Sequence, residues 1–324
     1  MIDTVALGRW LGAEVELEGR PTGGGWSNET VFVRAGGRSL VVRLTPSGRS
    51  MFPDYDLGHQ VRAMELAASA GLAVPEVLGY EPDPAVLGRP FFVMARVDGR
   101  VPADDDPPFT KAGFVFEAPP ERQRRLHDEA VDAIVAIGRV PTPDFAVVGP
   151  ALADHLAHCR HLDTWCELRP PVLDVAHAEL VASLPDDDPA HHGFLWGDAR
   201  PANMVLDDGF RIVALLDWEL AAAGPGELDV AWFLEMNHMR SLGMGIPMLA
   251  GFPDDAGTWA RWEAGTGRVA EAVGWHRLHA AYRVSTFMQL YLAKMVENGI
   301  IARDHRVLHD NPGTRRLQQL LAER

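Results

Sequence analysis

The residues most able to do chemistry lie in the run Leu-Trp-Gly-Asp-Ala-Arg-Pro-Ala-Asn at 195–203. Asp198 and Asn203 are five positions apart in this Gly- and Pro-containing stretch, and Asp217 follows an apolar run fourteen residues later. Carboxylate and amide oxygens suit Mg²⁺, a hard cation that takes few protein ligands and keeps water and phosphate as the others. A remaining carboxylate can orient or deprotonate a hydroxyl nucleophile. These residue types therefore suit a Mg²⁺ and phosphate site with a carboxylate that activates a hydroxyl, against the plainer interpretation that they only cap turns.

These side chains need elements that bring them together. The stretch 193–216 predicts two short strands around the turn signal Asp207-Asp208-Gly209. A hairpin there would place all three oxygen-bearing side chains at one end. Asp229, in the first turn of a following helix, is expected to be structural, because a carboxylate is favoured at the positive end of a helix. Glu219 is expected at most to support the site.

The first hundred residues predict strands with one helix. Segments 30–34 and 39–44 form a hairpin around Ala35-Gly36-Gly37, and 74–80 and 90–97 are short strands. The periodicity of 56–70 predicts the helix, with Gly71 ending it.

From residue 102 onward the chain is mainly helical. Helices are expected over 119–137, 151–168 and 171–184, and over most of the chain beyond 227. The two parts would join near 95–101, where Gly99 is expected to give flexibility. A cleft between two such lobes is a common ligand site.

Composition narrows the class of protein. The 324 residues carry 30 basic and 45 acidic side chains, a net charge of −15, which argues against binding nucleic acid or anionic membranes. The acidic runs 104–106 and 186–188 are expected to be solvated loops. With no signal peptide, no membrane span and two cysteines, the chain is expected to be a soluble cytoplasmic protein. Its oligomeric state is left open.

A zinc site is the competing interpretation for 155–166. On a helix, His155, Cys159 and Cys166 would share one stripe, and His158 and His161 lie nearby. The spacing lacks a C-x-x-C pair and is wider than that of zinc sites. A packed amphipathic helix is the favoured interpretation.

The amino-acid sequences of several segments resemble those of one family. GDARPAN followed by LDWELAAAGPGELDVAW is similar to the aminoglycoside phosphotransferase family of protein-kinase-like small-molecule phosphotransferases. The resemblance includes GGGWSNETVFV, VVRL and VPEVLGYEPDPAVLGRPFFVMARVDGR, and covers roughly residues 20–235. It implies an α+β, protein-kinase-like two-lobed fold, with a nucleotide-binding lobe at 1–97 and a catalytic, acceptor-binding lobe at 98–324.

The resemblance also implies roles for residues. Asp198 would be the catalytic base, and Asn203 and Asp217 would hold Mg²⁺. The residues assigned to ATP are the phosphate-covering loop with Gly24, Gly25, Ser27 and Asn28, the strand cation Arg43, the helix residue Gln60, and Met94 and Arg96 in the adenine-pairing segment 92–97.

Three positions depart from the family pattern. Arg43 stands where the family has a phosphate-binding Lys, and the two cations are not interchangeable where geometry is tight. Its helix partner is Gln60 or Glu65, both of which flank the apolar stripe of 56–70. Trp196 replaces the usual His, and we expect it to support the loop by packing and an indole N–H bond.

The sequence therefore predicts an ATP- and Mg²⁺-dependent kinase acting on a hydroxyl of a small molecule. The alternative is a nucleotide- or ligand-binding protein with little transfer activity, which the three departures motivate. Acceptors in such families include aminoglycosides and other antibiotics, sugars, choline-like alcohols and hydroxyacyl thioesters. A polycationic acceptor would need acidic residues, for which Glu235, Asp254, Asp255 and Glu263 are candidates.

Overall fold

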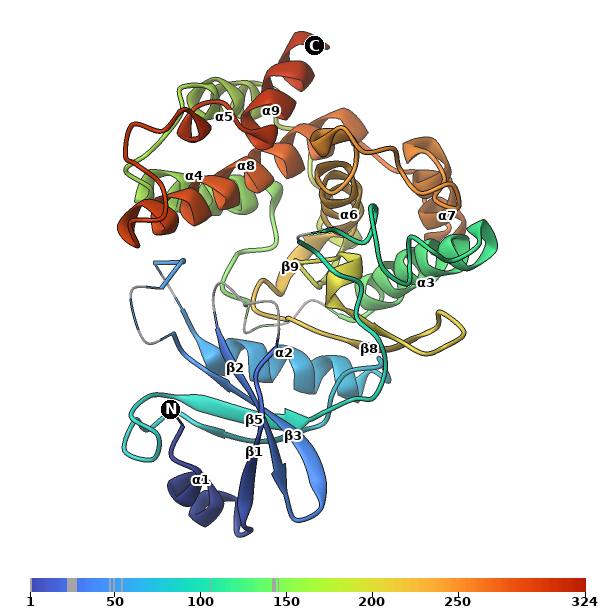
Figure 1. Ribbon diagram of the computed structural model, residues 1–324. Coiled ribbons are helices and arrows are strands. Elements are labelled where there is room, and N and C mark those ends of the chain that lie inside the picture. The colour runs from blue at the N-terminus through green and yellow to red at the C-terminus, as the bar shows by residue number, and fades with distance from the viewer. Residues whose placement is uncertain are drawn as a thin grey trace.

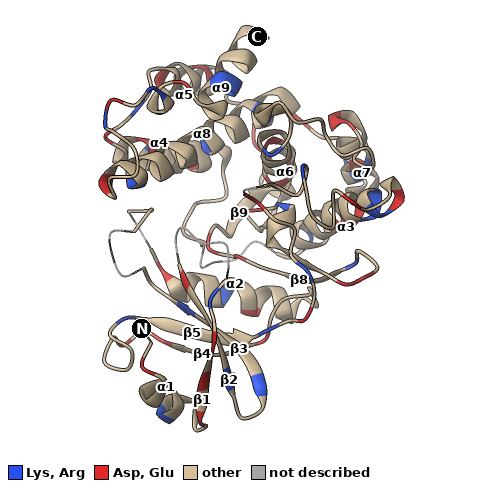
Figure 2. Ribbon diagram, viewed as in Figure 1, with Lys and Arg blue, Asp and Glu red and all other residues tan. Residues whose placement is uncertain are grey.

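The computed structural model describes residues 2–21, 28–46, 48, 50–53, 55–105, 107–141, 144 and 146–324. Figure 1 shows a strand-rich N-terminal region, with a larger, mainly helical region beyond it. This α+β division agrees with the prediction. Acidic and basic residues are interspersed over both regions in Figure 2. Within the described parts of the chain, no helix is both long and apolar enough to cross a membrane.

The N-terminal sheet has five strands in the order β1-β2-β3-β5-β4, and all neighbouring pairs are antiparallel. The strands are β1 (Val15–Gly19), β2 (Glu29–Ala35), β3 (Arg38–Leu44), β4 (Val77–Glu81) and β5 (Phe91–Ala95). The predicted hairpin is confirmed as β2 and β3, which turn at Gly36 and Gly37. Because side chains alternate along a strand, the sheet presents two apolar faces.

A helix packs on each face of this sheet. On one face, α2 (Leu57–Ser69) shares a core with Val41, Phe92 and Met94, as the predicted helix at 56–70 requires. On the other face lies α1 (Thr4–Leu11), whose Leu7 is fully buried. The prediction of one helix in the first hundred residues is therefore wrong. The missed signal is Asp3, which caps α1 by accepting the N–H groups of the next turn.

The connection to the helical region is tightly held. Arg100 and Leu206 exchange backbone hydrogen bonds of 2.8 and 2.9 Å. Gly99 has φ of 151°, and a Cβ there would lie 2.5 Å from Val205 Cγ1 and 2.7 Å from the Leu206 carbonyl oxygen. Gly99 therefore permits a close approach of two backbones, and the expectation that it gives flexibility is wrong.

The helical region contains α3 (Pro120–Gly138), α4 (Leu152–Trp165), α5 (Val172–Ala182), α6 (Glu227–Met239), α7 (Asp255–Thr266), α8 (Val273–Glu297) and α9 (Pro312–Ala322). One large core runs from α2 and β5 through α3 and α6 to α7, and a second lies among α4, α5, α8 and α9. The helices expected at 119–137, 151–168 and 171–184 are confirmed, each ending somewhat earlier or later than predicted.

Two small hairpin-like pairs lie between the sheet and the helices. The predicted hairpin is confirmed as β7 (Met204–Leu206) and β8 (Ile212–Leu215). A second pair joins β6 (His192–Leu195), at the start of the predicted stretch 193–216, to β9 (Ala222–Pro225), a pairing that the sequence did not indicate. Because each is only three or four residues long, these strands depend on tertiary pairing more than on their own periodicity.

Candidate active site

The loop between β6 and β7 is held in place by a buried carboxylate. Asp229, in the first turn of α6, accepts the N–H groups of Trp196 at 2.7 Å and Gly197 at 2.9 Å. Burial raises the pKa of Asp229 to about 6, and the two N–H donors oppose that rise. Its predicted place in the helix is confirmed, but its carboxylate also fixes the backbone just before Asp198.

Gly197 shows why this loop needs a glycine. Its φ is 82°, and a Cβ would meet the Leu220 carbonyl oxygen at 1.8 Å. The loop is therefore pressed against the segment after β8, and any side chain at 197 would displace it.

The Asp198 carboxylate is buried and receives three donors. Oδ2 accepts from Asn203 Nδ2 at 2.7 Å and Arg200 Nε at 2.9 Å, and Oδ1 accepts from Trp232 Nε1 at 2.9 Å. Three hydrogen bonds to one carboxylate fix its direction, which suits a group that must face a nucleophile. The structure thus brings Asp198 and Asn203 together, as their spacing suggests.

Asp217 reaches the same place through the β7–β8 hairpin. Leu216 N–H donates to the Asn203 carbonyl at 2.8 Å, so that Asn203 and Asp217 lie on adjacent backbone segments. Asp217 has φ of 59°, an uncommon conformation for a residue with a side chain and one that occurs at functional sites. Its Oδ1 lies 3.1 Å from Arg43 Nη2.

These donors fit a magnesium ion better than zinc. Asn203 Nδ2 donates to both the carbonyl and the carboxylate of Asp198, so the amide nitrogen is used and the amide oxygen, a hard ligand of the kind Mg²⁺ takes, is not part of these two bonds. No group of three or more His, Cys, Asp or Glu in the described residues is arranged to hold a metal.

The zinc interpretation is therefore wrong for the described part of 155–166. His155 Nε2 donates to the Ala223 carbonyl at 2.7 Å, and the Cys159 thiol lies 3.7 Å from His279 Nε2. Burial lowers the pKa of His155 to about 4 and raises that of Cys159 to about 11, so both are neutral. The favoured packed helix is α4.

The nucleotide side of the site is centred on Arg43. This side chain is buried on β3, and its Nε has no hydrogen-bond partner among the described residues. An orphaned guanidinium N–H beside a metal-type carboxylate fits a phosphate group. Gln60 is buried on α2 and donates to the Tyr55 hydroxyl at 3.1 Å, whereas Glu65 is exposed. Of the two expected helix residues, Gln60 therefore faces inward.

The structure describes some, but not all, of the other residues that were expected to bind the nucleotide. Gly24, Gly25 and Ser27 lie outside the described residues. Asn28 Nδ2 donates to Glu219 at 2.9 Å. Met94 is buried in β5, in the segment expected to meet adenine.

Arg96 is turned toward the outer strands. Its backbone N–H donates to the Ser39 carbonyl at 3.0 Å, and its guanidinium lies 4.4 Å from the Phe32 ring centroid. Its own N–H is thus used within the N-terminal sheet, and its role toward a nucleotide stays a prediction.

Trp196 has the role expected of it. The side chain is fully buried, and its indole N–H donates to the Leu216 carbonyl at 2.9 Å. It therefore ties the loop between β6 and β7 to the residue that precedes Asp217, a link that packing and one hydrogen bond supply without a histidine.

The sequence did not indicate an ion-pair cluster that lies beside the loop between β6 and β7. Arg200, besides holding Asp198, pairs with Asp104, and Arg240 donates to Asp104 at 2.6 and 2.9 Å. Although burial opposes it, the two guanidinium groups lower the pKa of Asp104 to about 2. Asp104 is thus not a residue of a solvated loop, and Asp187, which accepts the Leu152 N–H, is not one either. Residues 96 and 35 positions apart carry no local signal of such contacts.

A cavity of about 410 Å³ opens beside the loop, which lies within the roughly 300–1,000 Å³ of small-molecule pockets. Its lining includes Gly197, next to Asp198 in the chain, and Trp232, the indole donor to Asp198. Elements α2, α4, α6 and α8 all contribute to its walls. We refer to it below as the acceptor-side cavity.

Comparison with known proteins identifies the family to which this chain is similar. The model of the Phosphotransferase enzyme family (APH) matches residues 18–278. Acyl-CoA dehydrogenase family member 11 of Gallus gallus is 27% identical over 226 residues, 67% of this chain and 27% of that protein. The chain therefore matches only about a quarter of that relative's length.

Solved structures share the fold. A candidate aminoglycoside phosphotransferase from Ralstonia eutropha JMP134 has a TM-score of 0.75 at 20% identity and covers 100% of this chain and 99% of its own. The ternary complex of a thermostable mutant of aminoglycoside phosphotransferase APH(4)-Ia with ADP and hygromycin B has a TM-score of 0.62 at 16% identity, covering 98% and 97%. The two-lobed, protein-kinase-like fold predicted from the sequence is thereby confirmed.

Proposed function

Because the chain belongs to the Phosphotransferase enzyme family, we propose that it transfers the γ-phosphate of ATP to a hydroxyl group of a small molecule. The observation that carries the proposal is the Asp198 carboxylate, buried and oriented by Asn203, Arg200 and Trp232. ADP in the complex of the structural neighbour supports a nucleotide as the donor.

In this reaction the acceptor oxygen bonds to the γ-phosphorus as the bond to the bridging oxygen of ATP breaks. Asp198 orients the hydroxyl and takes its proton, which passes to solvent, and ADP leaves. The carboxylate is suited to this because its hydrogen bonds hold it in one direction, which lowers the entropic cost of alignment.

Asn203 and Asp217 are proposed to hold Mg²⁺ through one amide and one carboxylate oxygen. The ion would neutralise phosphate charge when bound. Arg43 would bind phosphate through the N–H groups not used by Asp217. Gly24, Gly25, Ser27, Asn28, Gln60, Met94 and Arg96 complete the proposed nucleotide site, and the division into lobes 1–97 and 98–324 is part of this proposal.

The test is ADP release across a library of hydroxyl acceptors, with Asp198→Asn as the blank. The wild-type protein is expected to release ADP with at least one acceptor, and Asp198→Asn to lose that activity while still binding ATP in calorimetry. Asp208→Asn, an exposed turn residue of the neighbouring hairpin, is the matched control and is expected to behave as wild type. Equal turnover by Asp198→Asn would refute the mechanism. ATP binding without acceptor-dependent release would favour the alternative, a nucleotide-binding protein with little transfer activity.

A further inference from the structure

The carboxylates around the acceptor-side cavity are already engaged. Asp229 accepts two backbone N–H groups, Glu219 accepts from Asn28, and Asp56 pairs with Arg62 at 3.0 Å. Two histidines of the wall add no positive charge, because burial lowers the pKa of His155 to about 4 and that of His279 well below its ordinary value.

Arg283, on α8, is a positively charged residue of the cavity wall, unlike the carboxylates and neutral histidines just described. Its guanidinium carbon lies 4.4 Å from the ring centroid of Trp232 and 5.3 Å from that of Phe287. Within the described residues the structure gives it no ion pair, and its side chain is partly open. Its charge is one of the causes that lower the pKa of His155 and oppose the rise in the pKa values of Cys159 and Asp229. Asp229 is thus within electrostatic reach of Arg283, but its carboxylate is bound to the Trp196 and Gly197 N–H groups.

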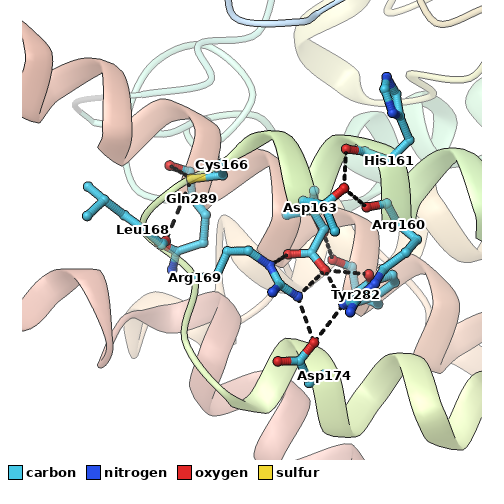
Figure 3. A network of polar contacts seen from close by, with 11 residues as sticks. Arg160, His161, Asp163, Cys166, Leu168, Arg169, Asp174, Tyr282 and Gln289 are labelled. Atoms are coloured by element: carbon cyan, nitrogen blue, oxygen red, sulfur yellow. Dashed lines mark hydrogen bonds and ion pairs between the residues drawn. The ribbon is translucent and has the colours of Figure 1, made fainter.

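Neighbouring arginines are neutralised. In Figure 3, Arg160 and Arg169 converge on Asp163, which also accepts the Tyr282 hydroxyl at 2.8 Å, and both reach Asp174. This network fixes α4 against α8 one residue before Arg283. Arg277, on the same helix, faces Glu235 and Glu323. Each carboxylate of the cavity wall is hydrogen-bonded or ion-paired to a group other than Arg283. In a chain with more acidic than basic residues, an arginine directed into such a cavity indicates an anionic ligand.

The acidic residues suggested for a polycation do not line this cavity. Glu235 is bound by Arg316 through two hydrogen bonds of 2.6 and 2.8 Å. Asp254 caps α7, and Glu263 accepts the N–H of Ala270. None of these, nor Asp255, is part of the cavity wall. The cavity therefore lacks free carboxylates for an aminoglycoside-type acceptor.

We propose that the acceptor carries an oxyanion, a carboxylate or a phosphate, and that Arg283 binds this group. This inference rests on the proposed function and names the substrate class of the same site. A guanidinium can hold either oxyanion through two parallel hydrogen bonds. Leu162, Leu195, Leu220 and Leu228 give the cavity an apolar wall for the carbon chain between the anion and the hydroxyl.

Trp232 contacts both Arg283 and the proposed catalytic base, Asp198. Its ring contacts Arg283, and its indole N–H holds Asp198 Oδ1. An acceptor whose anion lies at Arg283 would thus have its chain beside Trp232 and its hydroxyl toward Asp198. Arg283 is in this view a specificity-determining residue and not a catalytic one.

The test uses acceptors that share one carbon chain and differ at one end: α,ω-diols, ω-hydroxy carboxylates, ω-hydroxyalkyl phosphates and ω-amino alcohols. The wild-type protein is expected to use one of the anionic series with a kcat/KM at least tenfold above that of the diol. Arg283→Gln should lose this preference through a rise in the KM for the anionic acceptors that is at least tenfold larger than any change in the KM for the diol, and Arg283→Lys should retain part of the preference. The control is Arg315→Gln, which removes an exposed cation on α9.

Several outcomes overturn the inference. One is a preference for amino alcohols, or an anion preference that survives Arg283→Gln. Another is an equal loss with the diol and the anionic acceptors, which would identify Arg283 as a support for Trp232. The relative kcat/KM of carboxylate and phosphate decides which oxyanion is taken.

A binding measurement separates this inference from the proposed function. Octanoate and octyl phosphate lack the hydroxyl, and calorimetry should show one of them binding to the wild-type protein and not to Arg283→Gln. Binding of neither to the wild-type protein overturns the inference, whatever the activity. The absence of Asp198-dependent ADP release with any acceptor overturns the proposed function, while the binding result still reports on Arg283.

Discussion

Arg43 Nη2 and Asp217 Oδ1 are 3.1 Å apart, and this ion pair joins the N-terminal sheet to the segment after β8 across 174 positions of sequence. Burial opposes the charge of Arg43, and the carboxylates of Asp217 and Glu219 raise its pKa above the ordinary value. The pair places the proposed phosphate-binding cation directly beside the proposed metal ligand. A metal ion at Asp217 and a phosphate at Arg43 would therefore lie next to each other, and their binding would replace this ion pair.

Asp217→Ala should weaken nucleotide binding mainly when Mg²⁺ is present. The carboxylate that would hold the ion is removed, while Arg43 remains to meet the phosphates. We expect the Kd for ATP with Mg²⁺ to rise at least tenfold, and the Kd without metal to change much less. Calorimetry with and without Mg²⁺ measures both. An equal change in the two conditions would contradict a metal role for Asp217.

Arg43→Gln should raise the KM for ATP by about tenfold or more, because charge-assisted hydrogen bonds to phosphate are lost. Arg43→Lys keeps the charge but not the planar fork, so we expect a smaller rise. Steady-state kinetics at saturating acceptor compares them. Arg62→Gln, which removes a half-exposed cation on α2, is the control. A KM equal to that of wild type in Arg43→Gln would exclude phosphate contact by Arg43.

Trp232→Phe should lower kcat by about 10- to 100-fold, the equivalent of one hydrogen bond to a charged group. The variant keeps a ring against Arg283 but loses the N–H that holds Asp198 Oδ1. Trp218→Phe is the matched control, since its N–H donates to the Leu215 carbonyl and does not touch Asp198. Both variants are compared in kcat and thermal midpoint. A similar loss of kcat in the two would attribute the effect to packing.

Asp229→Asn should change how stability depends on pH. Burial raises the pKa of Asp229 to about 6 from an ordinary 3.8, so the folded state binds this proton more tightly than the unfolded chain. Its contribution is full below about pH 4 and is lost as pH rises through 6, about 2–3 kcal/mol in all. Relative to Asp229→Asn, the wild-type protein should therefore lose stability as the pH rises through this window. Denaturant unfolding across the range tests this, and parallel curves for the two proteins would contradict it.

Gly99→Ala should destabilise the protein by about 2–4 kcal/mol, because a new Cβ meets Val205 and the Leu206 backbone. Gly71→Ala is the control: its φ is also positive, at 79°, but nothing lies within 4 Å of a Cβ there. It should cost only about 1 kcal/mol, the conformational part of the effect. Thermal unfolding of both variants separates the cost of a positive φ from the cost of the steric clash between the new Cβ and its neighbours. Equal losses would show that the close approach at Gly99 is not needed.

The sequence alone was sufficient to predict features that depend on interactions between residues close together in the chain. The spacing of Asp198 and Asn203, and the turn at 207–209, predicted a hairpin and a convergence of oxygen ligands that the structure contains. The periodicity of α2 placed Gln60 and Glu65 beside its apolar stripe. Only packing against the sheet decided that Gln60 is buried and Glu65 exposed.

By itself the sequence thus determined the two-part α+β architecture and the grouping of polar side chains at 198–217, because hairpins, helices and short motifs depend on neighbours within a few positions. Only the tertiary structure showed the Arg200–Asp104–Arg240 cluster, the Trp232 contact with Asp198 and the position of Arg283 against Trp232 in the cavity wall. These depend on which distant side chains share a buried space. Whether an arginine is neutralised or left to bind a ligand is decided there, because only folding brings a carboxylate near it or keeps one away.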